Sequence, residues 1–394
     1  MLDLNMSIKV LVAYHYFAHY RLPILQELSV DKEITYTFIS GTTTDTDIKV
    51  ITPIAMAENQ IHWKKVLNIW FLKRKILWQV GLIRECVAGD YDVIIFLGSP
   101  YFLSTWFAII LSRLFGKTTF LWMHGILRQG RSDMVKIIFY RLANALLLYN
   151  HSVKPDLQRH GLSDEKLFTV YNSLDYRMQL SLRKQLQRRS LSSKKRELFT
   201  HPGNPVIVFI GRLTAKKKLD ELIAACAKLH QNGLPVNLLI IGEGMEKEKL
   251  ILLAREKQLQ EYAVFFGESY DEKVLATLIA LADICVSPGN VGLTCIHALT
   301  YGTPVITHDN PLEQMPEFEA ISDGETGMFF HQGSISSLAE TITKWLNINR
   351  DHREAIRNRC YQIIDEYYNP IFQAQAIKDA ILQQYSSHKR VNER

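Results

Sequence analysis

The stretch ADICVSPGNVGLTCIHALTYGTPVITHD, residues 282–309, decides the fold. An apolar run over 284–286 stops at a turn, and a segment with helical apolar spacing begins at Leu293. Gly302 then interrupts the chain before a second apolar run over 304–307. This order predicts a strand, a tight loop, a helix and a second strand.

The loop 289–292, Gly-Asn-Val-Gly, carries no charge and leads into the first turn of the predicted helix. The free N–H groups and the positive dipole end of a helix start form a natural anion site. A phosphate is the ligand that this arrangement favours. A turn that only reverses the chain is the alternative that the stretch by itself leaves open.

The length and composition of the chain indicate a folded protein of two domains. It has 394 residues, of which 22% are charged and 47% are hydrophobic, and a chain of this length exceeds one ordinary core. The five cysteines are scattered, odd in number and lack metal-type spacing. We therefore expect buried thiols in a reducing cytosol.

Charge is shared unevenly along the chain. Residues 1–190 contain 24 Lys and Arg against 15 Asp and Glu, a net charge of +9, whereas the remainder has 22 against 25, or −3. A basic first half predicts an anionic partner, either a membrane surface or a nucleic acid. The basic tract 183–196 lacks the interleaved aromatic residues of single-strand binders, so we expect no nucleic acid.

Residues 61–84, IHWKKVLNIWFLKRKILWQVGLIR, combine aromatic and basic side chains. We expect an amphipathic helix, which suits either the plane of an anionic bilayer or an ordinary solvated face. The most hydrophobic segment, 101–115, is shorter than the roughly 20 apolar residues of a membrane span. We therefore expect a cytoplasmic protein without a transmembrane helix. Peripheral contact with the inner face of the plasma membrane and an ordinary solvated face stay open as alternatives for residues 61–84.

Strands and helices alternate through both halves, which predicts an α/β protein with mostly parallel sheets. Ligands of such sheets bind at the carboxyl ends of the strands. In the first half, polar side chains follow two of the predicted strands at this end: His15, His19 and Arg21 after the first, and His124 after the strand 118–123. Candidate strands are 9–14, 34–39, 92–97, 118–123, 145–149, 167–171, 206–210, 236–241, 264–266, 284–286 and 304–307.

The second half resembles the C-terminal half of family 4 type glycosyltransferases, which have the GT-B fold. The resemblance covers nearly all of the second half, whereas the first half matches in pattern and at His124. The matching motifs are Gly211-Arg212-Leu213 with Lys217, the turn Ile240 to Gly244, Ser287-Pro288 with Gly292-Leu293, Gly302 to Ile306, and Asp323 to Gly327.

The resemblance implies two Rossmann-like domains that face each other across a cleft. We expect an N-terminal acceptor-binding domain over 1–175, a basic connector over 176–204 and a C-terminal nucleotide-sugar domain over 205–369. The last helix, 370–394, is expected to pack back on the N-terminal domain, with Pro370 at the bend.

The resemblance also implies roles for individual residues. Arg212 and Lys217 would hold the diphosphate, and His124 would position the donor sugar as the third catalytic residue. Apart from the resemblance, the position of His15, His19 and Arg21 after the first strand makes them the candidates for binding the acceptor. Further donor-binding residues would be Gly211, Gly242, Glu243, Gly244, Asn290, Gly292, Leu293, Thr294, His297 and Glu319.

This sequence departs from the family pattern at two positions. Family members usually carry two glutamates across the loop and helix of the opening stretch, and the matching positions here are Gly289 and His297. A histidine can still hydrogen-bond to ribose hydroxyls. Glycine cannot replace the glutamate that contacts the donor sugar, and the amide of Asn290 is the nearest substitute.

The sequence thus predicts a retaining, metal-independent hexosyltransferase without a cofactor. Its donor would be a UDP-sugar, favoured over a GDP-sugar, and its acceptor a saccharide, including a lipid-linked one, in bacterial capsule, O-antigen or exopolysaccharide biosynthesis. Two alternatives stay open: a catalytically silent nucleotide-sugar-binding subunit and a GT-B-fold epimerase. Asp45 and Asp47 have metal-type spacing, but their Thr-rich surroundings favour a solvated turn.

Overall fold

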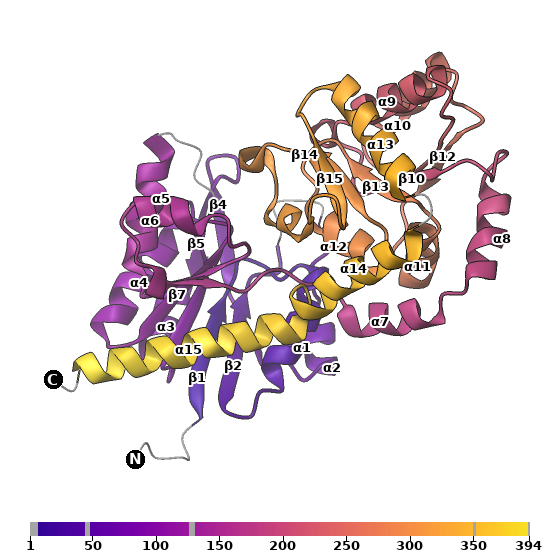
Figure 1. Cartoon of the computed structure of the whole chain (residues 1–394). Helices are drawn as coiled ribbons and strands as arrows, with labels where there is room; N and C mark the ends of the chain where they lie inside the picture. Colours follow the sequence, from indigo (N-terminus) through magenta and orange to yellow (C-terminus); the bar gives the residue numbers. More distant parts are fainter. Residues whose placement is uncertain (1–6, 44–47, 126–130, 350–351, 393–394) are drawn as a thin grey trace. The chain divides into compact units, whose positions relative to one another are not determined.

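The computed structural model describes residues 7–43, 48–125, 131–349 and 352–392. The chain divides into two compact units (Figure 1). Unit 1 comprises Met1–Asp175 and Pro370–Arg394, and unit 2 comprises Tyr176–Asn369. Asp45 and Asp47 lie outside the described residues.

Unit 1 is built on a seven-stranded sheet in the order β3-β2-β1-β6-β7-β8-β9, in which every pairing is parallel. Alternate residues of β1 enter different cores, because Val10 and Val12 face one layer and Leu11 and Ala13 the other. Burial of both faces explains why these strands read as continuous apolar runs. The strands are β1 Ile8–Ala13, β2 Ile34–Ser40, β3 Trp63–Lys65, β6 Val93–Leu97, β7 Thr118–Met123, β8 Ala145–Leu148 and β9 Leu167–Thr169.

Helices cover both faces of this sheet. One core layer takes side chains from α1 and α15, and the other takes them from α3, α4 and α5. The layered α/β arrangement places the loops that follow the strands along one edge. The helices are α1 Leu22–Ser29, α2 Pro53–Glu58, α3 Leu82–Ala88, α4 Leu103–Leu114, α5 Arg131–Leu142, α6 Lys154–Arg159 and α15 Pro370–Asn392, with 3-10 turns η1 His19–Arg21 and η2 Asp164–Lys166.

The C-terminal helix α15, yellow in Figure 1, belongs to unit 1. Ile377 and Ile381 are fully buried in the core layer of β1. Lys378 pairs with Asp31 at 3.1 Å and Glu33 at 2.8 Å. Proline suits the first turn of a helix, where no N–H partner is needed, so α15 begins at Pro370.

Residues 61–84 do not form the single amphipathic helix that we expected. They contain β3, an antiparallel hairpin of β4 Leu67–Phe71 and β5 Ile76–Val80, and the start of α3. Exposed and less exposed residues alternate along β4, as they do on a strand with one solvated face. Polar and apolar residues do not alternate regularly along β4 and β5, so the sequence pattern alone did not reveal these two strands.

Unit 2 contains a six-stranded parallel sheet in the order β12-β11-β10-β13-β14-β15. The strand order reverses between β10 and β13, which is where ligands bind in sheets of this type. The strands are β10 Val206–Ile210, β11 Asn237–Ile241, β12 Ala263–Gly267, β13 Ile284–Ser287, β14 Val305–His308 and β15 Gly327–Phe330. The helices are α7 Tyr176–Gln185, α8 Arg188–Leu198, α9 Leu219–Gln231, α10 Lys247–Glu256, α11 Glu272–Ala280, α12 Leu293–Thr300, α13 Ile335–Asn349 and α14 Arg353–Glu366, with 3-10 turns η3 Ala215–Lys217, η4 Pro311–Glu313 and η5 Pro316–Ala320.

The basic segment 176–204 is ordered into α7 and α8, which pack within unit 2. Arg183 donates two hydrogen bonds to Asp365, at 2.8 and 3.0 Å. Arg188 pairs with Glu354 at 2.7 Å. These cations therefore serve contacts inside the unit.

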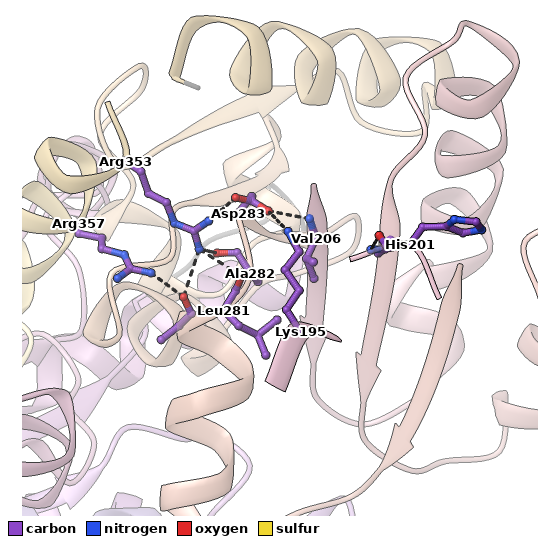
Figure 2. A network of polar contacts seen from close by, with 10 residues as sticks. Lys195, His201, Val206, Leu281, Ala282, Asp283, Arg353 and Arg357 are labelled. Atoms are coloured by element: carbon purple, nitrogen blue, oxygen red, sulfur yellow. Dashed lines mark hydrogen bonds and ion pairs between the residues drawn. The ribbon is translucent and has the colours of Figure 1, made fainter. Parts of the chain in front are cut away.

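A polar network around Asp283 joins α8 and α14 to the amino-terminal edge of this sheet (Figure 2). Asp283 accepts a 2.7 Å hydrogen bond from the backbone N–H of Val206 and forms an ion pair with Arg353. Arg353 also donates to the carbonyl of Ala282 at 2.7 Å. One carboxylate thus fixes the entry of β10 and the start of α14.

We expect Asp283→Ala to lower the free energy of unfolding by about 2–3 kcal/mol, because it leaves charged and backbone donors without their acceptor. Urea unfolding followed by tryptophan fluorescence measures this change. Glu354→Ala is the control, since the Glu354–Arg188 pair is solvent-exposed and is worth less than about 1 kcal/mol. Equal losses in both variants would contradict a structural role for the Asp283 network.

No helix in the described part of the chain has the length and apolar character needed to cross a membrane. All five cysteines are buried and unpaired by disulfides.

Candidate active site

Three loops of unit 2 meet at the carboxyl ends of its central strands. They follow β10, β11 and β13 and comprise residues 211–218, 242–246 and 288–292, which we call the loop cluster. Backbone hydrogen bonds join them: the N–H of Leu213 donates to Glu243, and that of Gly289 donates to Lys217. The sheet topology thus brings together segments that are far apart in the sequence.

Glycines at two positions allow these backbones to touch. A Cβ on Gly242 would lie 1.9 Å from the carbonyl oxygen of Gly211, and one on Gly289 would lie 2.0 Å from that of Lys216. No side chain fits at such distances unless the backbone moves. The glutamate expected at position 289 by resemblance is therefore excluded by the packing of the loop cluster.

The loop cluster contains two basic side chains, Arg212 and Lys217, which differ in exposure and in hydrogen bonding. Arg212 is exposed, and its side chain forms no hydrogen bond or ion pair within the described residues. Lys217 donates to the backbone oxygen of Asn290 at 2.6 Å and to its side-chain oxygen at 2.9 Å. Burial, together with the charge of Arg212, lowers the pKa of Lys217 to about 8, although Glu317 opposes this shift. A bound anion would stabilise the charged lysine.

The helix α12 starts immediately after the loop cluster. Gly292 has φ +56°, in the left-handed region that favours glycine, and Leu293 is the first helical residue. Thr294 donates through its hydroxyl to the carbonyl of Ile210 at 2.8 Å, which ties α12 to the end of β10. The N-terminal amides of α12 thus lie beside the residues that follow β10.

Two residues that the sequence analysis did not select help to shape this region. Gln314 is buried, accepts the N–H of Val291 at 3.0 Å and donates to the hydroxyl of Thr307 at 2.8 Å. Glu317 is buried and electrostatically coupled to Lys217. The predicted Glu319 is half-buried two residues away. Sequence spacing alone could not distinguish the two carboxylates of Pro-Glu-Phe-Glu-Ala.

His297, which replaces the second expected glutamate, contacts a carboxylate from another helix. Its Nε2 lies 2.9 Å from Glu272 of α11. Glu272 also accepts from Tyr301 at 2.7 Å and from Gln179 at 2.9 Å. Burial would raise the pKa of Glu272, but the charge of His297 and these hydrogen bonds outweigh it and hold the pKa at about 2.

The depressed pKa of Glu272 predicts a pH-dependent contribution to stability. The carboxylate stabilises the fold above its unfolded pKa of about 4.3, and this contribution is lost as the pH falls from there to about 2. We expect Glu272→Gln to be roughly 1–3 kcal/mol less stable at pH 7 and to lose less stability between pH 4.5 and 3. Urea unfolding at several pH values measures this, and parallel pH curves for both proteins would contradict it.

The remaining predicted donor residue, Glu243, forms an ion pair with Lys247 of α10 and stays partly exposed. Gly211 and Gly244 belong to the same loops and have φ of +144° and +156°. Most donor residues predicted from the sequence therefore lie in the loop cluster or at the first residue of α12. The exceptions are Thr294, His297 and Glu319.

Unit 1 has a cavity of about 500 Å³ at the carboxyl ends of its strands. His15, Arg21 and His124 line it, whereas His19 does not. His19 is exposed, and its ring nitrogen lies 3.3 Å from the carbonyl of Lys49. Of the three predicted acceptor residues, two therefore share one cavity with His124.

Both cavity histidines are kept neutral near pH 7. Burial, and then the charge of Arg21, lowers the pKa of His15 to about 3. The same two causes lower the pKa of His124 to about 4, although this residue, whose ring lies beside Tyr149, is partly exposed to solvent. Neutral imidazoles can donate and accept hydrogen bonds, as recognition of sugar hydroxyls requires.

Residues 192–362 match the family described as glycosyl transferases group 1. Among curated proteins, glycogen synthase of Edwardsiella ictaluri is 29% identical over 158 residues, 38% of this chain and 32% of that protein. A putative colanic acid biosynthesis glycosyltransferase WcaL of Salmonella typhimurium is 25% identical over 186 residues, 43% and 45% of the two chains. The chain thus spans less than half the length of these relatives.

Among solved structures, that of Anabaena Alr3699/HepE in complex with UDP has a TM-score of 0.72. The match covers 95% of this chain and 99% of that one at 16% identity, so it shows the fold. With two parallel, Rossmann-like α/β units, the chain has the GT-B fold, which confirms the predicted fold class.

Proposed function

We propose that this chain, which has the GT-B fold and carries a glycosyl transferases group 1 domain, is a glycosyltransferase that uses a nucleoside-diphosphate sugar. The observation that carries the proposal is the loop cluster of unit 2. It places the guanidinium of Arg212, the ammonium of Lys217 and the first amides of α12 at the switch point of a parallel sheet. Such an arrangement suits a diphosphate.

The proposed donor is a UDP-sugar. The structure of the Anabaena relative holds UDP, which supports this choice over GDP. We propose that Arg212 and Lys217 bind the diphosphate of the donor. In place of the glutamate excluded at Gly289, Asn290 would meet the donor sugar through its amide N–H₂, because its carbonyl oxygen already accepts from Lys217.

The proposed chemistry retains the configuration of the transferred sugar and uses no metal. An acceptor hydroxyl attacks the anomeric carbon on the face from which the diphosphate departs. The carbon–oxygen bond to phosphate breaks as the new glycosidic bond forms, and the leaving phosphate oxygen takes the hydroxyl proton. Arg212 and Lys217 stabilise the negative charge that develops on the diphosphate.

The proposed acceptor is a saccharide bound in the unit 1 cavity. Aromatic side chains such as Tyr16, Trp70 and Tyr101 line this cavity together with the neutral histidines. Their faces suit the apolar sides of sugar rings, and their polar ends suit hydroxyls. The name of the Salmonella relative supports a role in surface-polysaccharide biosynthesis.

We further propose that unit 1 touches an anionic membrane. The β4–β5 hairpin, α4 and α5 are neighbours in the fold and expose large apolar side chains, which soluble surfaces seldom gather in one area. Basic residues, Lys73 and Arg113 among them, are exposed within the same segments, which favours anionic lipid. The exposed apolar residues include Leu67, Phe71, Leu72, Val80, Leu103, Phe107, Ile110, Leu114, Phe115, Val135 and Ile138.

Vesicle flotation tests this contact with the folded chain. Wild type should float with phosphatidylglycerol vesicles and bind phosphatidylcholine vesicles weakly. The double variant Phe71→Ser and Leu72→Ser should lose most of the binding, whereas Leu252→Ser, at an exposed position of unit 2, should not. Equal flotation of all three proteins would overturn the membrane proposal.

A thermal-shift screen against UDP, GDP, ADP and dTDP tests the proposed donor site. We expect a rise in melting temperature with UDP and a smaller one or none with the others. A shift with UDP but no turnover of any UDP-sugar would instead support a silent binding subunit. No shift with any nucleotide, in a folded sample, would contradict the diphosphate site.

A further inference from the structure

Basic side chains line the cavity of unit 1. Arg21 lies in its wall, and Arg74 and Lys75 lie at its exposed rim. No Asp or Glu is among the described residues that line it. A cavity that binds only neutral sugars usually needs no excess of positive charge, because hydroxyl groups are recognised by neutral or mixed polar groups.

Arg21 is held in place without a carboxylate. Its guanidinium lies 4.9 Å from the ring centre of Tyr14, 5.2 Å from Trp122 and 5.4 Å from Tyr149. Its Nη2 donates to the hydroxyl of Tyr149. Among the described residues it has no ion pair with an acid, so its remaining donors are available to a ligand. A cation so enclosed by rings is costly unless an anion accompanies it.

The rim cations sit on a strained turn. Between β4 and β5, the three successive residues Leu72, Lys73 and Arg74 have φ of +48°, +53° and +65°. The left-handed region costs about 1 kcal/mol or more for each residue other than glycine. This turn brings Arg74 and Lys75 to the cavity, whereas Lys73 does not line it.

We propose that the acceptor bound in this cavity is an anion, with its phosphate or carboxylate group held by Arg21, Arg74 and Lys75. The inference rests on the proposed function, since it names the chemical class of the acceptor. Two sources supply this chemistry: the phosphate of a lipid-linked saccharide and the carboxylate of an acidic sugar. Arg21 presents its planar fork to either group, and the rim residues add charge.

Two matched pairs of probes test the proposal by titration of the tryptophan fluorescence of the full chain at low salt. Geranyl diphosphate is compared with geraniol, and cellobiouronic acid with cellobiose. We expect the anionic member of at least one pair to bind about tenfold or more tightly than its neutral partner. Tighter binding of geranyl diphosphate than of geraniol would identify the anionic group of the acceptor as a lipid phosphate. Tighter binding of cellobiouronic acid than of cellobiose would identify it as the carboxylate of an acidic sugar.

Three variants identify the residues responsible. Arg21→Met and the double variant Arg74→Gln with Lys75→Gln should each weaken the anionic probe about tenfold or more. Lys73→Gln, in the same turn but outside the cavity, should change it less than twofold. The rim residues are exposed, so the double variant remains a fair test if Arg21→Met is unstable.

Each of three results would overturn the inference. They are equal affinity for charged and neutral probes, unchanged affinity for the anionic probe in the cavity variants, and no binding of any probe to the folded wild type. The UDP thermal shift, measured on the same samples, reports unit 2 separately. A UDP shift without charge preference would overturn the anionic acceptor alone. Charge preference without any nucleotide shift would overturn the proposed function and leave an anion site in unit 1.

Discussion

Replacement of Arg212 or Lys217 by alanine should reduce kcat/KM for a UDP-sugar on the order of a hundredfold or more. Each variant removes a fixed cation from the position where charge develops on the leaving diphosphate, and one such group is worth about 3 kcal/mol or more of barrier. The Lys217 variant also frees Asn290, because two hydrogen bonds from its ammonium hold that residue. Release of UDP, followed by a coupled assay, measures the rates.

Lys216→Ala is the matched control, because Lys216 is an exposed neighbour with the same charge. We expect it to retain at least half of the wild-type rate. If kcat/KM fell less than about threefold in both the Arg212 and Lys217 variants, the proposed catalytic role of these residues would be wrong.

Gly289→Ala should damage both the fold and the site. The added Cβ would lie 2.0 Å from the carbonyl oxygen of Lys216 and 2.9 Å from the Cα of Lys217, both of which are backbone atoms. Backbone atoms cannot rotate away as a side chain can. The loops 211–218 and 288–292 must therefore move apart, which costs about 1–3 kcal/mol or more of stability. We expect a lower melting temperature and loss of the UDP-induced shift. Gly289→Glu should be at least as harmful, even though glutamate is common at this position in the family it resembles.

Gly203→Ala provides the control for this prediction, since no described atom beyond the two neighbouring residues lies within 4 Å of a Cβ at that position. Its melting temperature should match that of the wild type. A stable Gly289→Ala variant that binds UDP normally would mean that the backbone of the loop cluster adjusts more easily than its packing indicates.

The central strands of the parallel sheets could be predicted from the sequence because they are buried on both faces. Runs such as 93–97 and 206–210 are apolar throughout, and glycines or polar residues end them. The strands β3, β4 and β5 escaped prediction, because three- to five-residue strands rich in lysine and tryptophan also fit a helical pattern. The short strand β15 was missed because the turn before it dominated the composition.

The site was partly predictable for a similar reason. Arg212, Lys217 and the loop glycines follow strands directly in the sequence, so the topology alone places them at one edge of the sheet. Glu272 could not be assigned to His297, because it comes from a different helix and only tertiary packing brings the two within 2.9 Å. The buried role of Gln314 depends likewise on a loop whose path the sequence does not define.

A crystal structure of the chain with UDP would test the central proposal most directly. We predict that the diphosphate lies within hydrogen-bonding distance of Arg212, Lys217 and the first amides of α12, with the ribose near His297. UDP bound elsewhere, for example among the basic side chains around Arg353 and Lys195, or found only at the unit 1 cavity, would contradict the assignment of the donor site.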